Sequence, residues 1–149
     1  MTMKGHCTST TRLPSLLAAL AMATGSCTPS TAGAQSSPRI IQILADHDSR
    51  FKIPGQERPQ ITVKAGEKLI LRITAIKAKN HNRDGSIHGF ALLRASDRKP
   101  VDGWDLLLKP GTQEFNLTSP SEPGEYVVIC TVICSMDHEG MTIRVLVEP

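Results

Sequence analysis

Cys130-Thr-Val-Ile-Cys134-Ser-Met-Asp-His138-Glu-Gly-Met141 lies near the end of a chain of 149 residues. This run contains two thiols, an imidazole and a thioether at the spacing Cys-x3-Cys-x3-His-x2-Met. Apolar residues then occupy every second position from Met141 to Val147, which is typical of a β-strand with one buried face. The pattern therefore predicts a loop of metal-binding residues that leads directly into a strand.

The residue types in this loop restrict the metal that it can bind. Thiolate, thioether and imidazole ligands favour copper or zinc over calcium or magnesium. A mononuclear blue-copper centre needs two His and one Cys with a weak axial Met, whereas this loop offers two Cys and one His. Two thiolates can instead bridge two copper ions if each ion takes one imidazole. The loop therefore predicts a dinuclear copper site that needs a second His from elsewhere.

His88 is the candidate for that second imidazole. It lies in the apolar run Ile87–Leu93, which predicts a strand, and the adjacent Gly89 would let backbone come close to a site. His47 and His81 lie in polar loops, which are a poor platform for a rigid centre. We expect both of them to be exposed to solvent.

Three further residues have a structural interpretation and a functional one. Met136 lies inside the loop but out of register with the motif, so we expect it to pack or to contact the rim of the site. Asp137, beside His138, is expected to orient the loop. Trp104 is expected in the core or at its edge, and a place near the metal site is the alternative.

The N-terminal residues 1–34 are typical of an export signal. Lys4 and Arg12 give a positive start, and the mostly apolar run after them is too short to span a bilayer. Ala32-Gly33-Ala34 is a small-x-small cleavage site. The alternative is a poor lipoprotein box at Cys27, through which the chain would be anchored.

This interpretation divides the chain into a signal peptide (1–34), a linker (35–38) and a folded domain (39–149). It predicts that the mature chain has no membrane span and is located in a periplasm or outside the cell. Without Lys4 and Arg12 the domain has 15 basic and 14 acidic residues, a net charge of +1. Because nucleic-acid binding needs a strong basic surplus, we exclude nucleic acid as a partner.

Only Cys130 and Cys134 remain after the signal is removed, because Cys7 and Cys27 leave with it. In an oxidising compartment, a disulfide between the two is the alternative to metal binding. That disulfide would close a very small loop, and so would constrain the unfolded chain little. It would also leave His138 and Met141 at ligand spacing by chance.

Short apolar or alternating runs, separated by turn residues, predict the fold class. The runs are Ile40–Ala45, Ile61–Lys64, Lys68–Ala75, Ile87–Leu93, Trp104–Leu108, Gln113–Leu117, Glu125–Cys130 and Met141–Val147. Lys77–Ser86 and Ala95–Gly103 are expected to be loops. Seven or eight short strands at this spacing predict an all-β protein, in the form of an antiparallel β-sandwich.

The loop motif follows Pro-Gly-Glu-Tyr at 123–126 and pairs with an upstream Ile-His-Gly-Phe at 87–90. In this combination the sequence resembles the CuA cupredoxin domain, which occurs in subunit II of cytochrome c oxidases and at the C-terminus of nitrous oxide reductases. The resemblance covers residues 38–149. It implies a Greek-key cupredoxin sandwich that holds two copper ions.

The ligands that the resemblance implies are His88, Cys130, Val132, Cys134, His138 and Met141. The two cysteines would bridge both coppers, and each histidine would bind one of them. The methionine would be a weak axial ligand to one copper, and the backbone carbonyl of the valine would do the same for the other.

The sequence also departs from the family pattern. Oxidase subunit II usually has Glu at the position of Val132, where its side chain also serves an interfacial magnesium site. It also has a membrane hairpin ahead of this domain and an aromatic run that leads electrons inward. This sequence has none of these features, and it lacks the propeller domain of nitrous oxide reductase. The resemblance is therefore to the copper domain and not to a working oxidase subunit.

Three functions follow from these patterns. The first is an exported one-electron carrier whose partner is a redox protein such as a c-type cytochrome. The second is a copper-handling protein that passes copper to an acceptor protein for assembly of an oxidase or reductase. The third is a structural zinc site built from the same cysteines and histidines, with Met141 in the core. An enzyme is not expected, because a saturated metal site leaves no open position for substrate.

Overall fold

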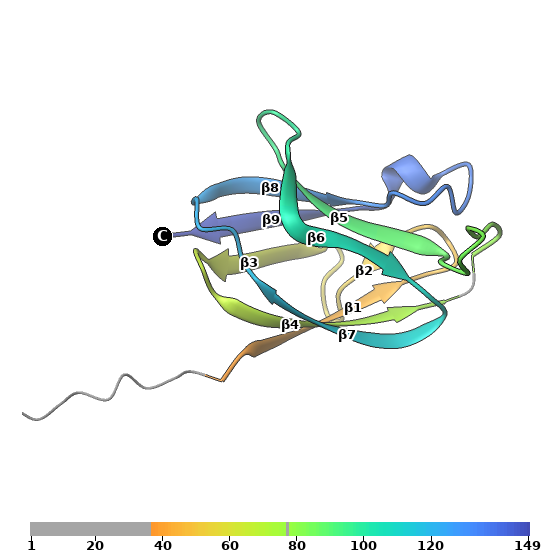
Figure 1. Cartoon of the computed structure of the whole chain (residues 1–149), viewed down its shortest axis with the longest axis horizontal. Helices are drawn as coiled ribbons and strands as arrows, with labels where there is room; N and C mark the ends of the chain where they lie inside the picture. Colours follow the sequence, from red (N-terminus) through yellow and green to blue (C-terminus); the bar gives the residue numbers. More distant parts are fainter. Residues whose placement is uncertain (1–36, 77) are drawn as a thin grey trace, which may run out of the picture. The chain divides into compact units, whose positions relative to one another are not determined.

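The computed structural model describes residues 37–76 and 78–149, which form two β-sheets packed face to face (Figure 1). The strands are β1 (Arg39–Ala45), β2 (Phe51–Lys52), β3 (Gln60–Lys64), β4 (Lys68–Ala75), β5 (His88–Arg94), β6 (Pro100–Leu108), β7 (Gly111–Thr118), β8 (Gly124–Ile129) and β9 (Thr142–Glu148). Within the described residues, the single helix is a 3-10 turn, η1 (His138–Gly140). The predicted signal peptide lies outside the described residues.

The strand order is β2-β1-β4-β7 in one sheet and β3-β9-β8-β5-β6 in the other. Most neighbours are antiparallel, but β1 runs parallel to β4, and β3 runs parallel to β9. The prediction of an all-β sandwich is confirmed, whereas the purely antiparallel arrangement is wrong. Residue alternation indicates which face of a strand is buried and carries no information about the direction of its neighbour.

The core between the sheets follows the period-two pattern of the sequence. Leu69, Leu71 and Ile73 of β4 are at most 1% exposed, and the alternate residues of β9 from Ile143 to Val147 are at most 2% exposed. Full burial of such a side chain contributes about 1.5–3 kcal/mol. The alternating strands therefore supply most of the hydrophobic stabilisation that holds the frame of the site.

Two segments differ from the sequence predictions. β6 begins at Pro100, inside the segment expected to be a loop, and Gly103 within it has φ 77°. β6 is the edge strand of its sheet, where proline and an irregular glycine are tolerated. β2 was not predicted, because two residues are too few for any periodicity. Its Phe51 packs edge-on against Phe90, with ring centroids 5.2 Å apart.

The strand registers bring three chain segments to the same end of one sheet. Ile129, the last residue of β8, pairs with Ala91 of β5 and with Thr142, the first residue of β9. The start of β5 at His88 and the whole loop 130–141 therefore lie at this end, where η1 is drawn in Figure 1. The two strands that flank the loop hold its ends about one strand spacing apart.

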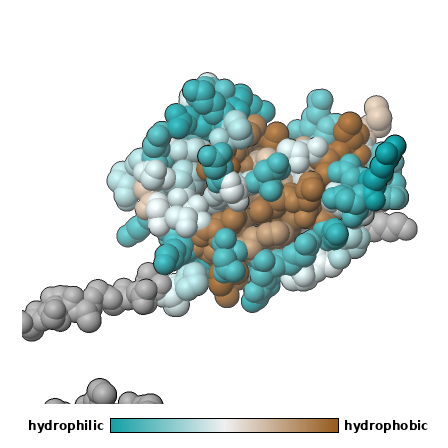
Figure 2. Space-filling model, in the orientation of Figure 1, coloured by the Kyte–Doolittle hydropathy of each residue, from teal (hydrophilic) through white to brown (hydrophobic). Residues whose placement is uncertain are grey.

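Apolar atoms also reach the surface. Figure 2 shows a band of apolar surface between hydrophilic regions on the face turned to the viewer. Among the described residues, the large hydrophobic side chains that are exposed are Ile40, Ile76, Leu107, Ile133 and Met136. Two of these belong to loop 130–141, and the 95% exposure of Met136 places it on the rim and not in the core.

Within residues 37–76 and 78–149, the structure contains no helix with the length and apolar character that a bilayer crossing requires.

Candidate metal centre

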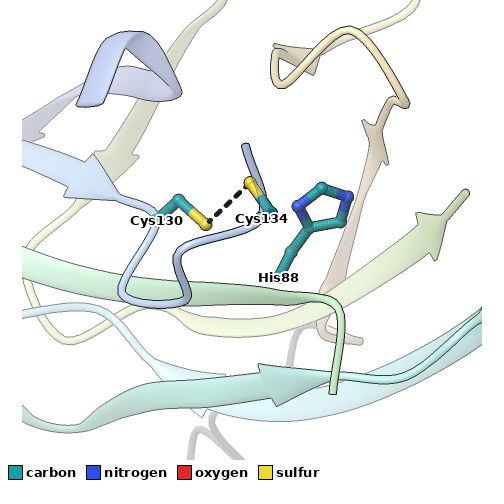
Figure 3. Close-up of side chains that lie close together, drawn as sticks. All are labelled: His88, Cys130 and Cys134. Atoms are coloured by element: carbon teal, nitrogen blue, oxygen red, sulfur yellow. Dashed lines mark hydrogen bonds between the residues drawn. The ribbon is translucent and has the colours of Figure 1, made fainter. Parts of the chain in front are cut away.

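His88, Cys130 and Cys134 come together at the loop end of the sandwich. One ligand atom from each of these residues lies within 4.8 Å of the other two, and all three side chains are buried. Figure 3 shows them converging from β5, from the end of β8 and from the loop. These are three of the six ligands that the sequence predicted.

The core pattern of the strands explains why two of these side chains point inward. His88 shares a face of β5 with Phe90 and Leu92, which are at most 1% exposed. Cys130 continues the buried face of β8 beyond Val128. Because β5 and β8 are hydrogen-bonded neighbours, the imidazole and the thiol both cap the same end of the hydrophobic core.

The loop returns Cys134 to the same place. The Cys134 amide donates a hydrogen bond to the Val132 carbonyl at 2.7 Å, and the Asn80 amide donates one to the Cys134 carbonyl at 3.2 Å. The first and last residues of the loop are joined directly, because the Cys130 amide donates a hydrogen bond to the Met141 carbonyl at 3.2 Å. Cys134 is 0% exposed as a result.

The two thiols are separate in this structure. The sulfur atoms of Cys130 and Cys134 are 3.9 Å apart, and both cysteines are free. A disulfide would hold them at about 2.05 Å, so the alternative of a Cys130–Cys134 bridge is not realised here. Burial, reinforced by the neighbouring Cys134, raises the pKa of the Cys130 thiol to about 11. At neutral pH this thiol keeps its proton until a metal displaces it.

His88 presents a free nitrogen to the two sulfurs. Its Nε2 lies 3.3 Å from the Ile76 carbonyl, to which it donates, so Nδ1 carries the lone pair of the neutral ring. Nδ1 is buried and has no hydrogen-bond partner. Desolvation lowers the pKa of His88, which keeps the ring neutral. A buried polar atom without a partner costs about 1–3 kcal/mol, and a metal ion would satisfy it.

Gly89 allows β5 to approach the loop closely. A Cβ at this position would lie 2.0 Å from Thr131 Oγ1 and 2.8 Å from the Thr131 amide nitrogen. The Gly89 amide donates a hydrogen bond to the Cys130 sulfur at 3.4 Å. The sequence prediction of close backbone approach at Gly89 is therefore confirmed.

The other three predicted ligands are Val132, His138 and Met141. The Val132 carbonyl lies 3.3 Å from the Cys130 sulfur, which donates to it. Met141 is 0% exposed at the end of the loop. His138 is partly exposed, and its Nδ1 donates a hydrogen bond to the Ser135 carbonyl at 3.0 Å. His138 does not belong to the group of three, so its coordination of a metal stays a prediction.

The remaining sequence candidates take structural places. His47 and His81 are exposed, as expected. Trp104 is 3% exposed, and its indole donates to the Thr118 carbonyl at 2.9 Å, which fixes it in the core. Thr118 pairs with Lys68 at the end of β7 away from the loop, so Trp104 is directed away from the cluster. The Asp137 carboxylate does not cap η1, and only its amide donates, to Ser135 Oγ at 3.0 Å.

Sequence reasoning missed the turn between β1 and β2. Ser49 in this turn is 3% exposed, and its hydroxyl lies 2.6 Å from the Ser135 hydroxyl and 3.8 Å from the Cys134 sulfur. Arg50 donates to the Gly140 carbonyl at 3.0 Å. These contacts join residues 85 or more positions apart, so spacing along the chain gave no signal for them.

Asp46 anchors this turn. Its carboxylate accepts hydrogen bonds from Lys52 at 2.5 Å and from the His47 amide at 2.7 Å. The hydrogen bond from Lys52 is the largest cause that lowers the pKa of Asp46 from 3.8 to about 2. A carboxyl group whose pKa falls on folding stabilises the folded state above its unfolded pKa, and this contribution is lost as pH falls through the folded pKa.

We therefore expect the contribution of Asp46 to lower the free energy of unfolding by about 1 kcal/mol between pH 5 and pH 2. The value is this small because Lys52 is half-exposed, so that solvent screens its attraction for the carboxylate. Urea unfolding of wild type and Asp46→Asn across this range measures it. The variant should lose this component of the pH dependence, and Asp105→Asn at an exposed position of β6 should keep it. Identical pH profiles for Asp46→Asn and wild type would contradict the assignment.

Comparison with known proteins supports the fold. A scan against protein-family models found no match, and a search of curated protein sequences found none either. Among solved structures, auracyanin A, a "blue" copper protein from Chloroflexus aurantiacus, matches with a TM-score of 0.51 and 20% identity, over 75% of this chain and 100% of that chain. Auracyanin B matches with a TM-score of 0.50 and 18% identity, over 76% of this chain and 91% of that chain. Identities at this level establish architecture alone, and the chain therefore has the cupredoxin fold.

Proposed function

We propose that this chain holds a dinuclear CuA-type copper centre and works as an exported one-electron carrier. The observation that carries the proposal is the buried group of His88, Cys130 and Cys134, in which the imidazole Nδ1 has no partner in the protein. Two soft sulfur donors and a neutral imidazole suit copper. Bound copper supplies the chemistry of the site, which is the gain and loss of one electron.

Each predicted ligand has a role in this proposal. Cys130 and Cys134 would each supply a thiolate to both coppers, and His88 would bind one of the coppers through its unpartnered Nδ1. Met141, buried at the end of the loop just before β9, would supply its thioether as a weak ligand to one copper, and the Val132 carbonyl would be a weak ligand to the other. The carbonyl already faces the Cys130 sulfur at 3.3 Å, which supports this assignment.

His138 would bind the second copper, and its hydrogen bond to Ser135 determines which ring nitrogen is free to do so. Its Nδ1 donates to the Ser135 carbonyl, so the lone pair of the neutral ring is on Nε2. Coordination through Nε2 would keep this hydrogen bond, whereas coordination through Nδ1 would require it to break. The side chain is only partly buried in a loop without strand structure, so the change needs no rearrangement of the core.

The frame of the site supports electron transfer over catalysis. His88, Cys130 and Cys134 are each at most 6% exposed. Such a buried site can exchange an electron through the protein, but a substrate molecule cannot reach it. Strands β5, β8 and β9 hold the ligands from both ends of the loop, so the geometry changes little between oxidation states. The proposed exported location rests on the signal-like sequence of residues 1–34, and the proposed partner is a redox protein such as a c-type cytochrome.

The second candidate function is copper delivery to an acceptor protein. The observation that favours it is His138, which is partly exposed and bonded to Ser135 instead of joining the buried group. A site with one ligand outside its core can open to release metal. A structural zinc site would use the same cysteines and histidines.

One experiment separates the carrier from the delivery protein. Copper-loaded protein is mixed in one series with a reduced c-type cytochrome and in another with an apo CuA acceptor domain. We expect rapid, reversible reduction by the cytochrome with copper retained. Stoichiometric passage of copper to the acceptor, with slow electron exchange, would instead establish delivery. Zinc retention with no stable copper form would exclude both.

A further inference from the structure

We propose that Ser49, in the turn between β1 and β2, is a positioning residue of the metal centre whose hydroxyl donates a hydrogen bond to the Cys134 sulfur when a metal is bound. This inference rests on the proposed site at Cys130 and Cys134. It adds a residue that lies 85 positions from Cys134 in the sequence.

The contact is made inside the protein. Ser49 is 3% exposed and Ser135 is 9% exposed, and their hydroxyl oxygens are 2.6 Å apart. Ser49 Oγ also lies 3.8 Å from Cys134 Sγ, within the range of a sulfur hydrogen bond. The Ser49 hydroxyl therefore stands between a sulfur that can bind metal and a second hydroxyl of the ligand loop.

Metal binding reverses the direction of the hydrogen bond between Cys134 and Ser49. In the free protein the Cys134 thiol donates to Ser49, and the hydroxyls of Ser49 and Ser135 share a hydrogen bond in which either can be the donor. A metal-bound thiolate has lone pairs and no proton, so it can only accept. The thiol proton leaves to solvent, and the Ser49 hydroxyl then rotates to donate to the sulfur. Ser135 donates to Ser49 in turn, while its own oxygen keeps the amide of Asp137 at 3.0 Å.

The turn holds Ser49 in place before any metal arrives. Ser49 has φ 59°, a conformation that is uncommon for a residue with a side chain and persists only where the surroundings fix it. Here the Ser49 amide donates to the Asp46 carbonyl at 3.1 Å, and the Asp46 amide donates to the Arg50 carbonyl at 2.9 Å. Lys52 bridges the carboxylates of Asp46 and Asp48 at 2.5 and 2.8 Å.

Arg50 anchors the same turn to the other end of the ligand loop, through the Gly140 carbonyl. The turn therefore contacts the loop on both sides of His138, at Ser135 and at Gly140. Only the Ser49 contact reaches a sulfur. Arg50 therefore provides a control, because its side chain also holds the turn against the ligand loop but makes no contact with a sulfur.

The two sulfurs receive different kinds of donor. Cys130 accepts from the Gly89 backbone amide, which no side-chain substitution removes. Cys134, once its thiolate is bound to metal, would accept from the Ser49 side chain. Hydrogen bonds to a copper-bound cysteine sulfur tune its reduction potential. Removing the Ser49 hydroxyl leaves more negative charge on Cys134 alone, which stabilises the oxidised centre and makes the two halves of the centre unequal.

The test uses Ser49→Ala and Ser49→Gly, both of which remove the hydroxyl, while only the glycine tolerates the positive φ without strain. Arg50→Gln is the matched control. In copper-loaded protein, we expect both Ser49 variants to lower the reduction potential by the same amount, on the order of a tenfold change in the oxidised-to-reduced ratio, or about 59 mV. Their sulfur-to-copper absorption bands should shift, while Arg50→Gln should keep the wild-type potential.

Two results would overturn the inference. One is a wild-type potential and absorption in both Ser49 variants, and the other is an equal shift in Arg50→Gln, which would assign the effect to clamping. Cobalt(II) loading of all variants separates this inference from the proposed function, because the thiolate-to-cobalt band reports on the sulfurs without copper. A protein that binds cobalt and not copper refutes the proposed function alone. A cobalt band unchanged by both Ser49 variants refutes the role of Ser49.

Discussion

Replacing His88 with leucine is expected to abolish copper binding while raising the free energy of unfolding of the metal-free protein by about 1 kcal/mol. His88 is 0% exposed, and its Nδ1 has no partner in the protein. An apolar side chain of similar volume removes that unsatisfied atom, and the cost of such an atom is about 1–3 kcal/mol. The loss of the long 3.3 Å contact to the Ile76 carbonyl offsets part of the gain.

Urea unfolding of the metal-free proteins, together with copper content after dialysis, measures both effects. The matched control is His81→Leu at an exposed loop position, which should change neither quantity. Copper retained by His88→Leu at the wild-type stoichiometry would contradict the assignment. A metal-free variant destabilised by more than about 2 kcal/mol would contradict the expected cost of the unpartnered Nδ1 in the metal-free protein.

The second large effect is expected at Gly89. In Gly89→Ala the new Cβ would lie 2.0 Å from Thr131 Oγ1 and 2.8 Å from the Thr131 backbone nitrogen, so β5 and the loop must separate. Overpacking of this kind costs about 1–3 kcal/mol. The separation also weakens the hydrogen bond from the Gly89 amide to the Cys130 sulfur, which is now 3.4 Å long. We expect lower stability, weaker copper binding and an altered copper spectrum together.

A double-mutant cycle with Thr131→Ala isolates the clash. The single Thr131→Ala change, at an exposed position, should be close to neutral. The double variant should recover part of the lost stability, because the contact with Oγ1 disappears while the contact with the backbone nitrogen remains. Strictly additive effects, or a Gly89→Ala protein with wild-type stability and spectrum, would show that the close approach is unimportant.

The sequence predicted most of the frame because buried strands alternate. The buried faces of β4 and β9 follow the alternation of their residues, and Cys130 lies in step with the buried Val128 of β8. The sequence did not predict the parallel pairing of β1 with β4, because residue alternation is the same whether a neighbouring strand runs parallel or antiparallel. The first half of β6 was missed since its proline and glycine read as loop residues, and an edge strand accepts both.

The same distinction applies to the site. Ligand type and spacing identified the loop, and strand position together with an adjacent glycine selected His88 over His47 and His81. The Ser49 contact to Cys134 could not be predicted, because serine has no distinctive chemistry by itself and the contact depends on tertiary packing. The hydrogen bond that holds His138 on Ser135 is likewise a property of the folded loop.

The most direct test of the proposed centre is metal analysis combined with an EPR spectrum of the purified, copper-loaded protein. Two thiols, two imidazoles, a thioether and a carbonyl suit two copper ions, bridged by Cys130 and Cys134. We predict two coppers per mature chain and, in the oxidised form, one unpaired electron shared equally between them. A single copper per chain, with the four-line hyperfine pattern of one nucleus, would contradict the dinuclear centre.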